Sequence, residues 1–315
     1  MTVPVFRFHE MRFPLPRPVT RGSRLAVVAP AGPFQEETFR DGIAWLSQRY
    51  EVIYRADIFS KYGYLAGVDD RRLVELSDAL IDPDIDAVVC ARGGFGATRI
   101  LPGLDLNLVQ KANKMIIGFS DITALHARWF TAGVRSVHAP MVAALANASS
   151  SIREKWITAV EHPETRLRWD LTPLNDVDPT PVTGRLTGGN LAVLAALMGT
   201  PYAPHLRGSI LFLEDVGERP YRVDRMLTSL SQAGAFDQIA GLVVGAFTEG
   251  DPGNDGVTLV DVLERHFANA PYPVLTGFPA GHIPENEPIP FGTKASIQGG
   301  ELCAGATEVG LEDLT

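Results

Sequence analysis

Short apolar segments that lack polar alternation recur in the first half of the chain, between segments with helical spacing. The apolar segments lie at residues 24–29, 51–54, 85–91 and 114–118. Phe39–Tyr50 and Arg71–Ile81, by contrast, repeat their apolar residues as an amphipathic helix does. Strands without polar alternation are buried on both faces, which is typical of a parallel sheet covered by helices. The sequence therefore predicts an α/β fold built on a parallel sheet.

The length of the chain indicates two domains. Its 315 residues exceed what one hydrophobic core usually accommodates. Residues 147–183 include one isolated helical segment and the Pro- and Asp-rich stretch Leu171–Pro181, which is typical of a linker. We therefore expect an N-terminal domain at 1–146, a linker region at 147–183 and a C-terminal domain at 184–315. Expected elements of the second domain include the strand Ser209–Val216, the helix Leu259–Phe267 and a β-hairpin within Lys294–Ala304.

Composition and charge exclude several classes of partner. The formal net charge is −9 and the basic residues are scattered, so we expect neither nucleic acid nor a membrane surface as partner. No apolar run approaches the roughly 20 residues of a membrane helix, and Met1–Arg21 lacks the apolar core of a secretory signal. Two cysteines without zinc-site spacing fit a reducing compartment and predict no metal site. We expect a cytoplasmic protein.

The turn Gly118-Phe119-Ser120-Asp121-Ile122 is the strongest candidate for chemistry, because ligands of parallel sheets bind where strands end. A strand precedes the turn and a helix follows it, which is the context of a nucleophile elbow with Ser120 at its tip. The match is partial, since Ile122 stands where the elbow pattern has a second glycine. A helix N-cap is the alternative for Ser120, and the pattern alone favours it.

The segment Arg92-Gly93-Gly94-Phe95-Gly96 follows another predicted strand. Glycines let the backbone approach a ligand closely, and their N–H groups can stabilise an anion. A plain turn without a ligand is about equally compatible with the pattern. The glycine spacing does not match a dinucleotide fingerprint, so no cofactor is expected.

A serine nucleophile needs a histidine base and a carboxylate that orients it. Among the seven histidines, His138 and His282 lie in loops restricted by proline or glycine, which suits a functional side chain. Glu214 lies at the end of an apolar strand, and Glu218 in the loop beyond it is the competitor. The residues alone leave both choices open.

Six motifs taken in order resemble the LD-carboxypeptidase family, serine peptidases that include muramoyltetrapeptide carboxypeptidase and the microcin C immunity peptidase. The resemblance extends from about Gly22 to the C-terminus. The motifs are Val28-Ala29-Pro30-Ala31-Gly32-Pro33, Ala91-Arg92-Gly93-Gly94-Phe95-Gly96, Gly118-Phe119-Ser120-Asp121-Ile122-Thr123-Ala124-Leu125, Gly188-Gly189-Asn190-Leu191, Leu213-Glu214-Asp215-Val216 with Pro220–Leu227, and Gly281-His282 followed by Pro288–Gly292.

The resemblance implies a Ser-Glu-His triad, with Ser120 as nucleophile, His282 as base and Glu214 as its orienting carboxylate. It also implies a flavodoxin-like or Rossmann-like N-terminal domain, a smaller C-terminal α/β domain and an active site between them. Backbone N–H groups of Asp121 and of Gly94, preferred over Gly93, would form the oxyanion hole. Phe95 and Phe119 stand where the family often has tyrosine, which removes a hydroxyl group and leaves the triad intact.

The implied substrate is a small peptide with a C-terminal D-residue, most simply the murein tetrapeptide, which loses its terminal D-Ala. Arg92 is the candidate partner of the substrate carboxylate, and Gly93 and Phe95 are further candidate substrate contacts. A homodimer is expected from the resemblance. Two alternatives remain: a microcin C immunity-like peptidase that cleaves peptidyl or aminoacyl nucleotides, and a non-catalytic nucleotide-binding α/β protein.

Overall fold

Strands and helices alternate through the first half of the chain, as its apolar segments predict. The structure, a computed structural model, describes residues 12–176 and 180–305. The elements of this half are β1 (Arg24–Val28), α1 (Glu36–Leu46), β2 (Glu51–Tyr54), α2 (Asp69–Ile81), β3 (Ala87–Cys90), α3 (Ala97–Ile100), η2 (Leu101–Gly103), α4 (Leu106–Ala112), β4 (Met115–Gly118), η3 (Ser120–Ile122), α5 (Thr123–Thr131), β5 (Ser136–His138), α6 (Val142–Leu145) and α7 (Ser150–Glu161).

The first sheet has the strand order β12-β5-β4-β3-β1-β2. Strands β1 to β5 run parallel to one another, and their order is that of the flavodoxin-like doubly wound fold. The sixth strand, β12 (Ile289–Phe291), comes from near the other end of the chain and pairs antiparallel with β5. The predicted parallel α/β domain is therefore confirmed.

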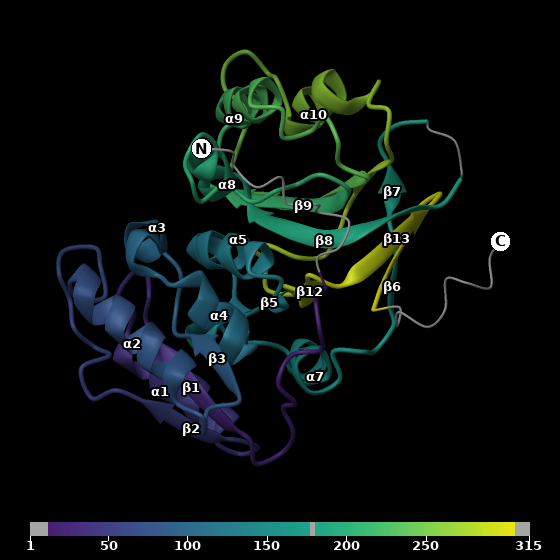
Figure 1. Cartoon of the computed structure of the whole chain (residues 1–315). Helices are drawn as coiled ribbons and strands as arrows, with labels where there is room; N and C mark the ends of the chain where they lie inside the picture. The colour runs from purple at the N-terminus through teal and green to yellow at the C-terminus, as the bar shows by residue number, and fades with distance from the viewer. Residues whose placement is uncertain (1–11, 177–179, 306–315) are drawn as a thin grey trace, which may run out of the picture.

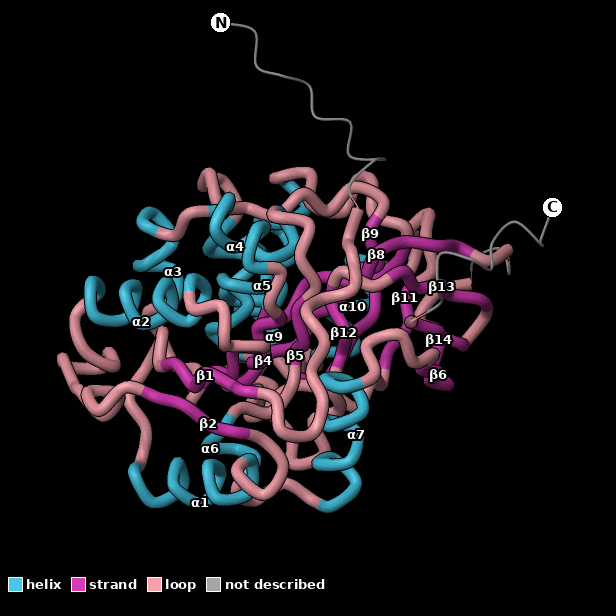
Figure 2. The backbone as a smooth tube through the Cα atoms, turned by 60° about the horizontal axis from the view of Figure 1, so that its bottom comes forward, coloured by secondary structure: helices cyan, strands magenta, loops and turns pink. Residues whose placement is uncertain are grey.

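Helices cover both faces of the first sheet (Figures 1 and 2). Alternate residues of β1 show this directly. Leu25 and Val27 are buried in the cluster that includes residues of α1, α6 and α7, whereas Ala26 and Val28 are buried in the cluster that includes residues of α2, α4 and α5. Burial on both faces explains why β3 and β4 contain no charged residue, whereas the edge strand β2 is largely exposed.

The second half forms its own sheet, with the order β6-β14-β13-β8-β9-β10-β11-β7. The four adjacent strands β8 to β11 are parallel, and helices α8, α9 and α10 cover one face of the sheet (Figure 1). The elements are β6 (Leu167–Asp170), β7 (Thr172–Pro173), β8 (Val182–Asn190), α8 (Leu191–Leu197), β9 (Ser209–Val216), α9 (Pro220–Gln232), β10 (Gly241–Thr248), α10 (Leu259–Phe267), β11 (Val274–Thr276), β13 (Lys294–Gln298) and β14 (Glu301–Ala304).

The prediction that residues 147–183 form a linker is wrong for most of this range. Helix α7 packs into the first half, with Trp156 fully buried in that core. Strands β6 and β7 belong to the second sheet, where they pair with β14 and β11. Residues 177–179 of the Pro- and Asp-rich stretch lie outside the described residues. The expected boundary at 184 does not separate the two sheets either, because β12 joins the first one.

Two negative findings hold for residues 12–176 and 180–305. No helix there is long and apolar enough to cross a bilayer. No group of three or more His, Cys, Asp or Glu side chains within these ranges is arranged to hold a metal ion. Cys90 and Cys303 are both free and buried.

Candidate active site

Ser120 lies at a strained turn between β4 and α5. Its φ angle is 65°, in the left-handed region that non-glycine residues seldom occupy. The N-cap of the short helix η3 is Phe119, and no side chain caps either η3 or α5. The helix N-cap that the pattern favoured for Ser120 is therefore wrong. A strained turn that presents a serine at the end of a parallel strand is the geometry of a nucleophile elbow.

Ser120, His282 and Glu214 form a continuous chain of hydrogen bonds. His282 Nε2 lies 3.1 Å from Ser120 Oγ, and His282 Nδ1 lies 2.7 Å from Glu214 Oε2. Glu214 is fully buried and His282 is mostly covered. An ionised carboxylate only accepts hydrogen bonds, so it places the imidazole proton on Nδ1 and leaves Nε2 free to accept the serine proton. The arrangement can activate Ser120 for attack on a carbonyl.

The loop at 277–288 carries His282, and hydrogen bonds between its backbone and nearby side chains hold it in place. Gly281 has a φ angle of 127°, and a Cβ atom at this position would lie 3.0 Å from Glu214 Oε2. Its N–H donates to Asn286 Oδ1 at 2.9 Å. The hydroxyl of Thr248, at the end of β10, donates to the carbonyl of His282. Glycine at 281 therefore gives the backbone the conformation and the space that the His282–Glu214 contact needs.

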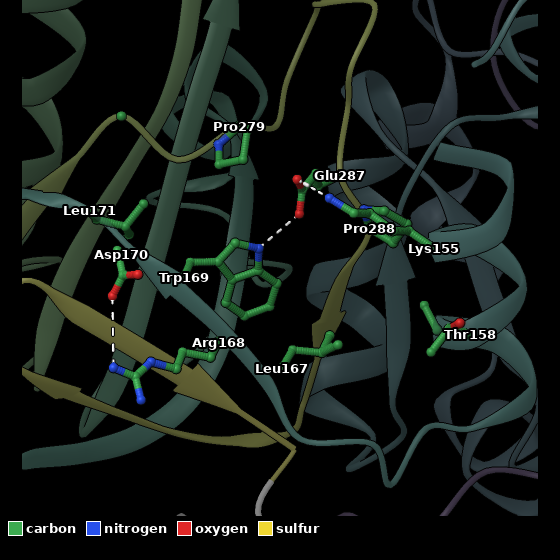
Figure 3. Close-up of a pocket in the computed structure, with 12 residues that line it drawn as sticks. Lys155, Thr158, Leu167, Arg168, Trp169, Asp170, Leu171, Pro279, Glu287 and Pro288 are labelled. Atoms are coloured by element: carbon green, nitrogen blue, oxygen red, sulfur yellow. Dashed lines mark hydrogen bonds and ion pairs between the residues drawn. The ribbon is translucent and has the colours of Figure 1, made fainter. Parts of the chain in front are cut away.

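A cavity of about 510 Å³ lies on one side of this loop (Figure 3), lined by residues of α7, β6 and the loop itself. The side chains of Ser120, His282 and Glu214 do not line it. Glu287 accepts a hydrogen bond from the Trp169 indole at 2.9 Å and pairs with Lys155 (Figure 3). Because Glu287 belongs to the loop, these contacts attach the His282 loop to α7 and β6.

Comparison with known proteins decides the family. The profile of the LD-carboxypeptidase N-terminal domain matches residues 25–139, and that of the LD-carboxypeptidase C-terminal domain matches residues 183–297. The chain belongs to the LD-carboxypeptidase family. A probable murein peptide carboxypeptidase of Bacillus subtilis is 34% identical over 92% of this chain and 93% of its own. The murein tetrapeptide carboxypeptidase of Pseudomonas aeruginosa is 32% identical over 89% and 94%.

Solved structures agree with this assignment. The muramoyltetrapeptide carboxypeptidase from Oxalobacter formigenes superposes with a TM-score of 0.82 at 31% identity, over 90% of this chain and 100% of its own. The structure of MccF in complex with glutamyl sulfamoyl guanosine gives a TM-score of 0.83 at 21% identity, over 93% of this chain and 99% of its own, and shares the fold. The expected family is confirmed, and a non-catalytic nucleotide-binding protein does not fit it.

In this LD-carboxypeptidase the glycine loop after β3 lies against Ser120. A Cβ atom on Gly93 would lie 3.0 Å from Ser120 Cβ and 3.2 Å from Ser120 Oγ, whereas Gly94 faces Gly32 in the loop after β1. Arg92 is exposed and donates to the Pro33 carbonyl at 2.7 Å. Phe95 is half-exposed and contacts Tyr64. The loop thus places its backbone, rather than the Arg92 side chain, next to Ser120.

The Gly93→Ala variant is expected to lose activity without losing the fold. The φ angle of Gly93 lies outside the left-handed region, so alanine fits the backbone, but its methyl group presses on Ser120. We expect kcat/KM to fall by about 10²-fold, the cost of displacing a reacting group. The control is Gly253→Ala, where the nearest side-chain atom lies 3.5 Å away. An unchanged kcat/KM in Gly93→Ala would show that the contact is irrelevant.

The carboxyl group of Asp121 ties the elbow to the glycine loop. Its Oδ2 accepts the N–H of Ala97 at 2.8 Å, at the start of α3, and its side chain is buried. Burial raises the pKa of this carboxyl from 3.8 to about 6, although the Ala97 N–H and the Arg72 guanidinium both favour the charged form. Arg72 itself is buried and donates to the Gly96 carbonyl at 2.7 Å.

The raised pKa of Asp121 predicts a pH-dependent cost in stability. Between pH 3.8 and about 6 the folded protein keeps a proton that the unfolded chain loses, so wild-type stability falls as the pH rises through this window. The side-chain amide of the Asp121→Asn variant cannot ionise. We expect the unfolding free energy of this variant, relative to wild type, to increase by up to about 3 kcal/mol from pH 4 to pH 7. Urea unfolding at both pH values measures this, and a difference that does not change with pH would contradict it.

The residues that competed for the triad lie elsewhere. His138 is fully buried at the end of β5, among Phe119, Phe212 and Phe291, and burial lowers its pKa well below 6.5. Glu218 pairs with Arg222 at 3.6 Å. Phe119 was not among the expected site residues, yet the centroid of its ring lies 4.9 Å from that of the His282 ring.

Proposed function

We propose that this protein is a metal-independent serine carboxypeptidase that cleaves an L,D-amide bond and releases terminal D-Ala from the murein tetrapeptide. The observation that carries the proposal is the Ser120–His282–Glu214 chain of hydrogen bonds in a member of the LD-carboxypeptidase family. The names of the relatives, which include a murein tetrapeptide carboxypeptidase, support the substrate class.

Ser120 Oγ attacks the carbonyl carbon of the L,D-amide while His282 Nε2 takes its proton. His282 then passes this proton to the departing amine of the D-residue, which leaves an acyl-enzyme on Ser120. Water, deprotonated by the same imidazole, hydrolyses the ester and restores the serine. Glu214 orients the imidazole and stabilises its cationic form in each step.

The developing oxyanion is stabilised by backbone N–H groups of Asp121 and of Gly94, with Gly93 as the alternative donor. The position of Gly93 against Ser120 supports a role for this loop. Arg92, Gly93 and Phe95 are proposed to contact the substrate, with Arg92 pairing with its terminal carboxylate. In the structure the Arg92 guanidinium contacts the Pro33 carbonyl, so this role requires the side chain to rotate.

A substrate panel tests the function. Purified protein is incubated with L-Ala-γ-D-Glu-meso-diaminopimelate-D-Ala, with the same peptide ending in L-Ala, and with an aminoacyl-sulfamoyl adenylate. We expect mass spectrometry to detect D-Ala released from the first compound alone. Cleavage of the adenylate without cleavage of the tetrapeptide would overturn the proposal in favour of a microcin C immunity-like peptidase. No cleavage of any compound would reject both functions.

We further propose that the protein acts in the cytoplasm as a homodimer. The two free, buried cysteines support a reducing compartment, and the dimer is inferred from the family resemblance. Light scattering coupled to size-exclusion chromatography tests the dimer, because a mass of 34.1 kDa would identify a monomer.

A further inference from the structure

The stretch Gly188-Gly189-Asn190 lies at the carboxyl end of β8 and has no part in the proposed mechanism. It nevertheless makes a buried contact with the helix that follows the nucleophile. The backbone N–H of Asn190 donates to Thr123 Oγ1 at 2.9 Å, and both residues are buried. Thr123 is the first residue of α5 and lies three positions after Ser120. This contact therefore links the second sheet to the elbow.

The same asparagine is bound to the strand that carries Glu214. Its Nδ2 donates to Asp215 Oδ1 at 2.8 Å, and the other oxygen of Asp215 accepts the N–H of Ala192 at 2.9 Å. In the pairing of β8 with β9, Asn190 lies opposite Glu214. A short path of buried hydrogen bonds thus runs from Thr123 through Asn190 to Asp215, the neighbour of Glu214.

The two glycines permit this close approach. Gly188 and Gly189 have φ angles of 127° and 129°. A Cβ atom on Gly188 would collide with the backbone of Phe212, and one on Gly189 would collide with the hydroxyl of Thr123. Larger residues would therefore push β8 away from both β9 and α5, which separates the two parts of the triad.

We propose that the contacts of Thr123, Asn190 and Asp215, here termed the interface brace, fix Ser120 relative to the Glu214–His282 pair. Thr123 is then a positioning residue that acts through Ser120. The inference rests on the proposed function, because it requires that Ser120 and His282 act as nucleophile and base. It adds that the alignment of the two halves depends in part on the hydroxyl group of Thr123.

The test compares Thr123→Val, which loses the hydroxyl, with Thr123→Ser, which keeps it. We expect kcat to fall on the order of 10- to 100-fold in Thr123→Val, with KM nearly unchanged, because misplacement of a reacting group acts on the chemical step. Thr123→Ser should recover most of the loss. The matched control is Thr131→Val on the same helix, whose hydroxyl donates within the helix to Ala127. Wild-type kcat in Thr123→Val would overturn the proposal.

A double-mutant cycle separates alignment from a general loss of structure. The readout is the rate at which a fluorophosphonate labels Ser120, which requires no peptide substrate. If the brace aligns Ser120 with His282, Thr123→Val slows labelling in wild type but has little effect in a His282→Ala background. Equal slowing in both backgrounds would identify a merely structural role and overturn the proposal. If the wild-type protein neither cleaves the tetrapeptide nor is labelled, the proposed function itself fails, whereas failure of the brace leaves wild-type activity intact.

Discussion

Replacement of Ser120 by alanine is expected to lower kcat/KM for D-Ala release by about 10⁴- to 10⁶-fold, the loss typical of a missing serine nucleophile. The residual rate comes from substrate binding and the backbone N–H groups, which the substitution leaves in place. Alanine and serine tolerate a left-handed backbone about equally poorly. The free energy of unfolding should therefore change little. The rate of D-Ala release measures the loss of activity, and thermal unfolding of the same variant measures any loss of stability.

Ser151→Ala is the matched control for this variant, because Ser151 is exposed on α7. We expect it to retain wild-type kcat/KM and full labelling by a fluorophosphonate. The Ser120→Ala variant should bind the tetrapeptide without cleaving it. If Ser120→Ala retained more than a small part of the wild-type rate, another residue would have to be the nucleophile.

Replacement of His282 by alanine is expected to have a comparable effect, about 10⁴- to 10⁶-fold in kcat/KM, because Ser120 then has no base at hydrogen-bonding distance. The losses should not add. The double variant Ser120→Ala with His282→Ala should be no slower than either single variant, since the residues act as one unit. Measurement of all three rates on the tetrapeptide tests this.

His162→Ala serves as the control for the histidine substitution, since the His162 side chain is 59% exposed at the end of α7. Its kcat/KM should match wild type. A double variant much slower than both single variants would indicate that Ser120 and His282 contribute independently, which a triad does not allow.

Much of the fold could be predicted from local sequence patterns. Strand β9 and helix α10 have the predicted bounds, and the terminal hairpin forms as β13 and β14. The errors concern strands that depend on distant partners. Strand β6 is four residues long and partly charged, and its partner β14 lies more than a hundred positions away. Strand β12 has three residues including a proline. Local patterns carry little information about such pairings.

The site could be predicted in part. The resemblance to the LD-carboxypeptidase family implies Ser120, Glu214 and His282 as the triad, and the structure brings these three residues together. The pattern alone favoured a helix N-cap for Ser120 over the nucleophile elbow, because serine followed by aspartate is an ordinary helix start. The contact between Thr123 and Asn190 was not predicted either. The residues adjacent to each in the sequence do not indicate that the two face each other.

The return of β12 to the first sheet has a consequence for biosynthesis. A ribosome makes the chain from its N-terminus, and early segments begin to fold before later ones exist. The edge of β5 stays unpaired until Ile289–Phe291 has emerged, and the loop that carries His282 immediately precedes this strand. Docking of β12 therefore brings His282 to Ser120, which was made more than 160 residues earlier. Ser120 therefore has no imidazole partner in the nascent chain until β12 has docked against β5.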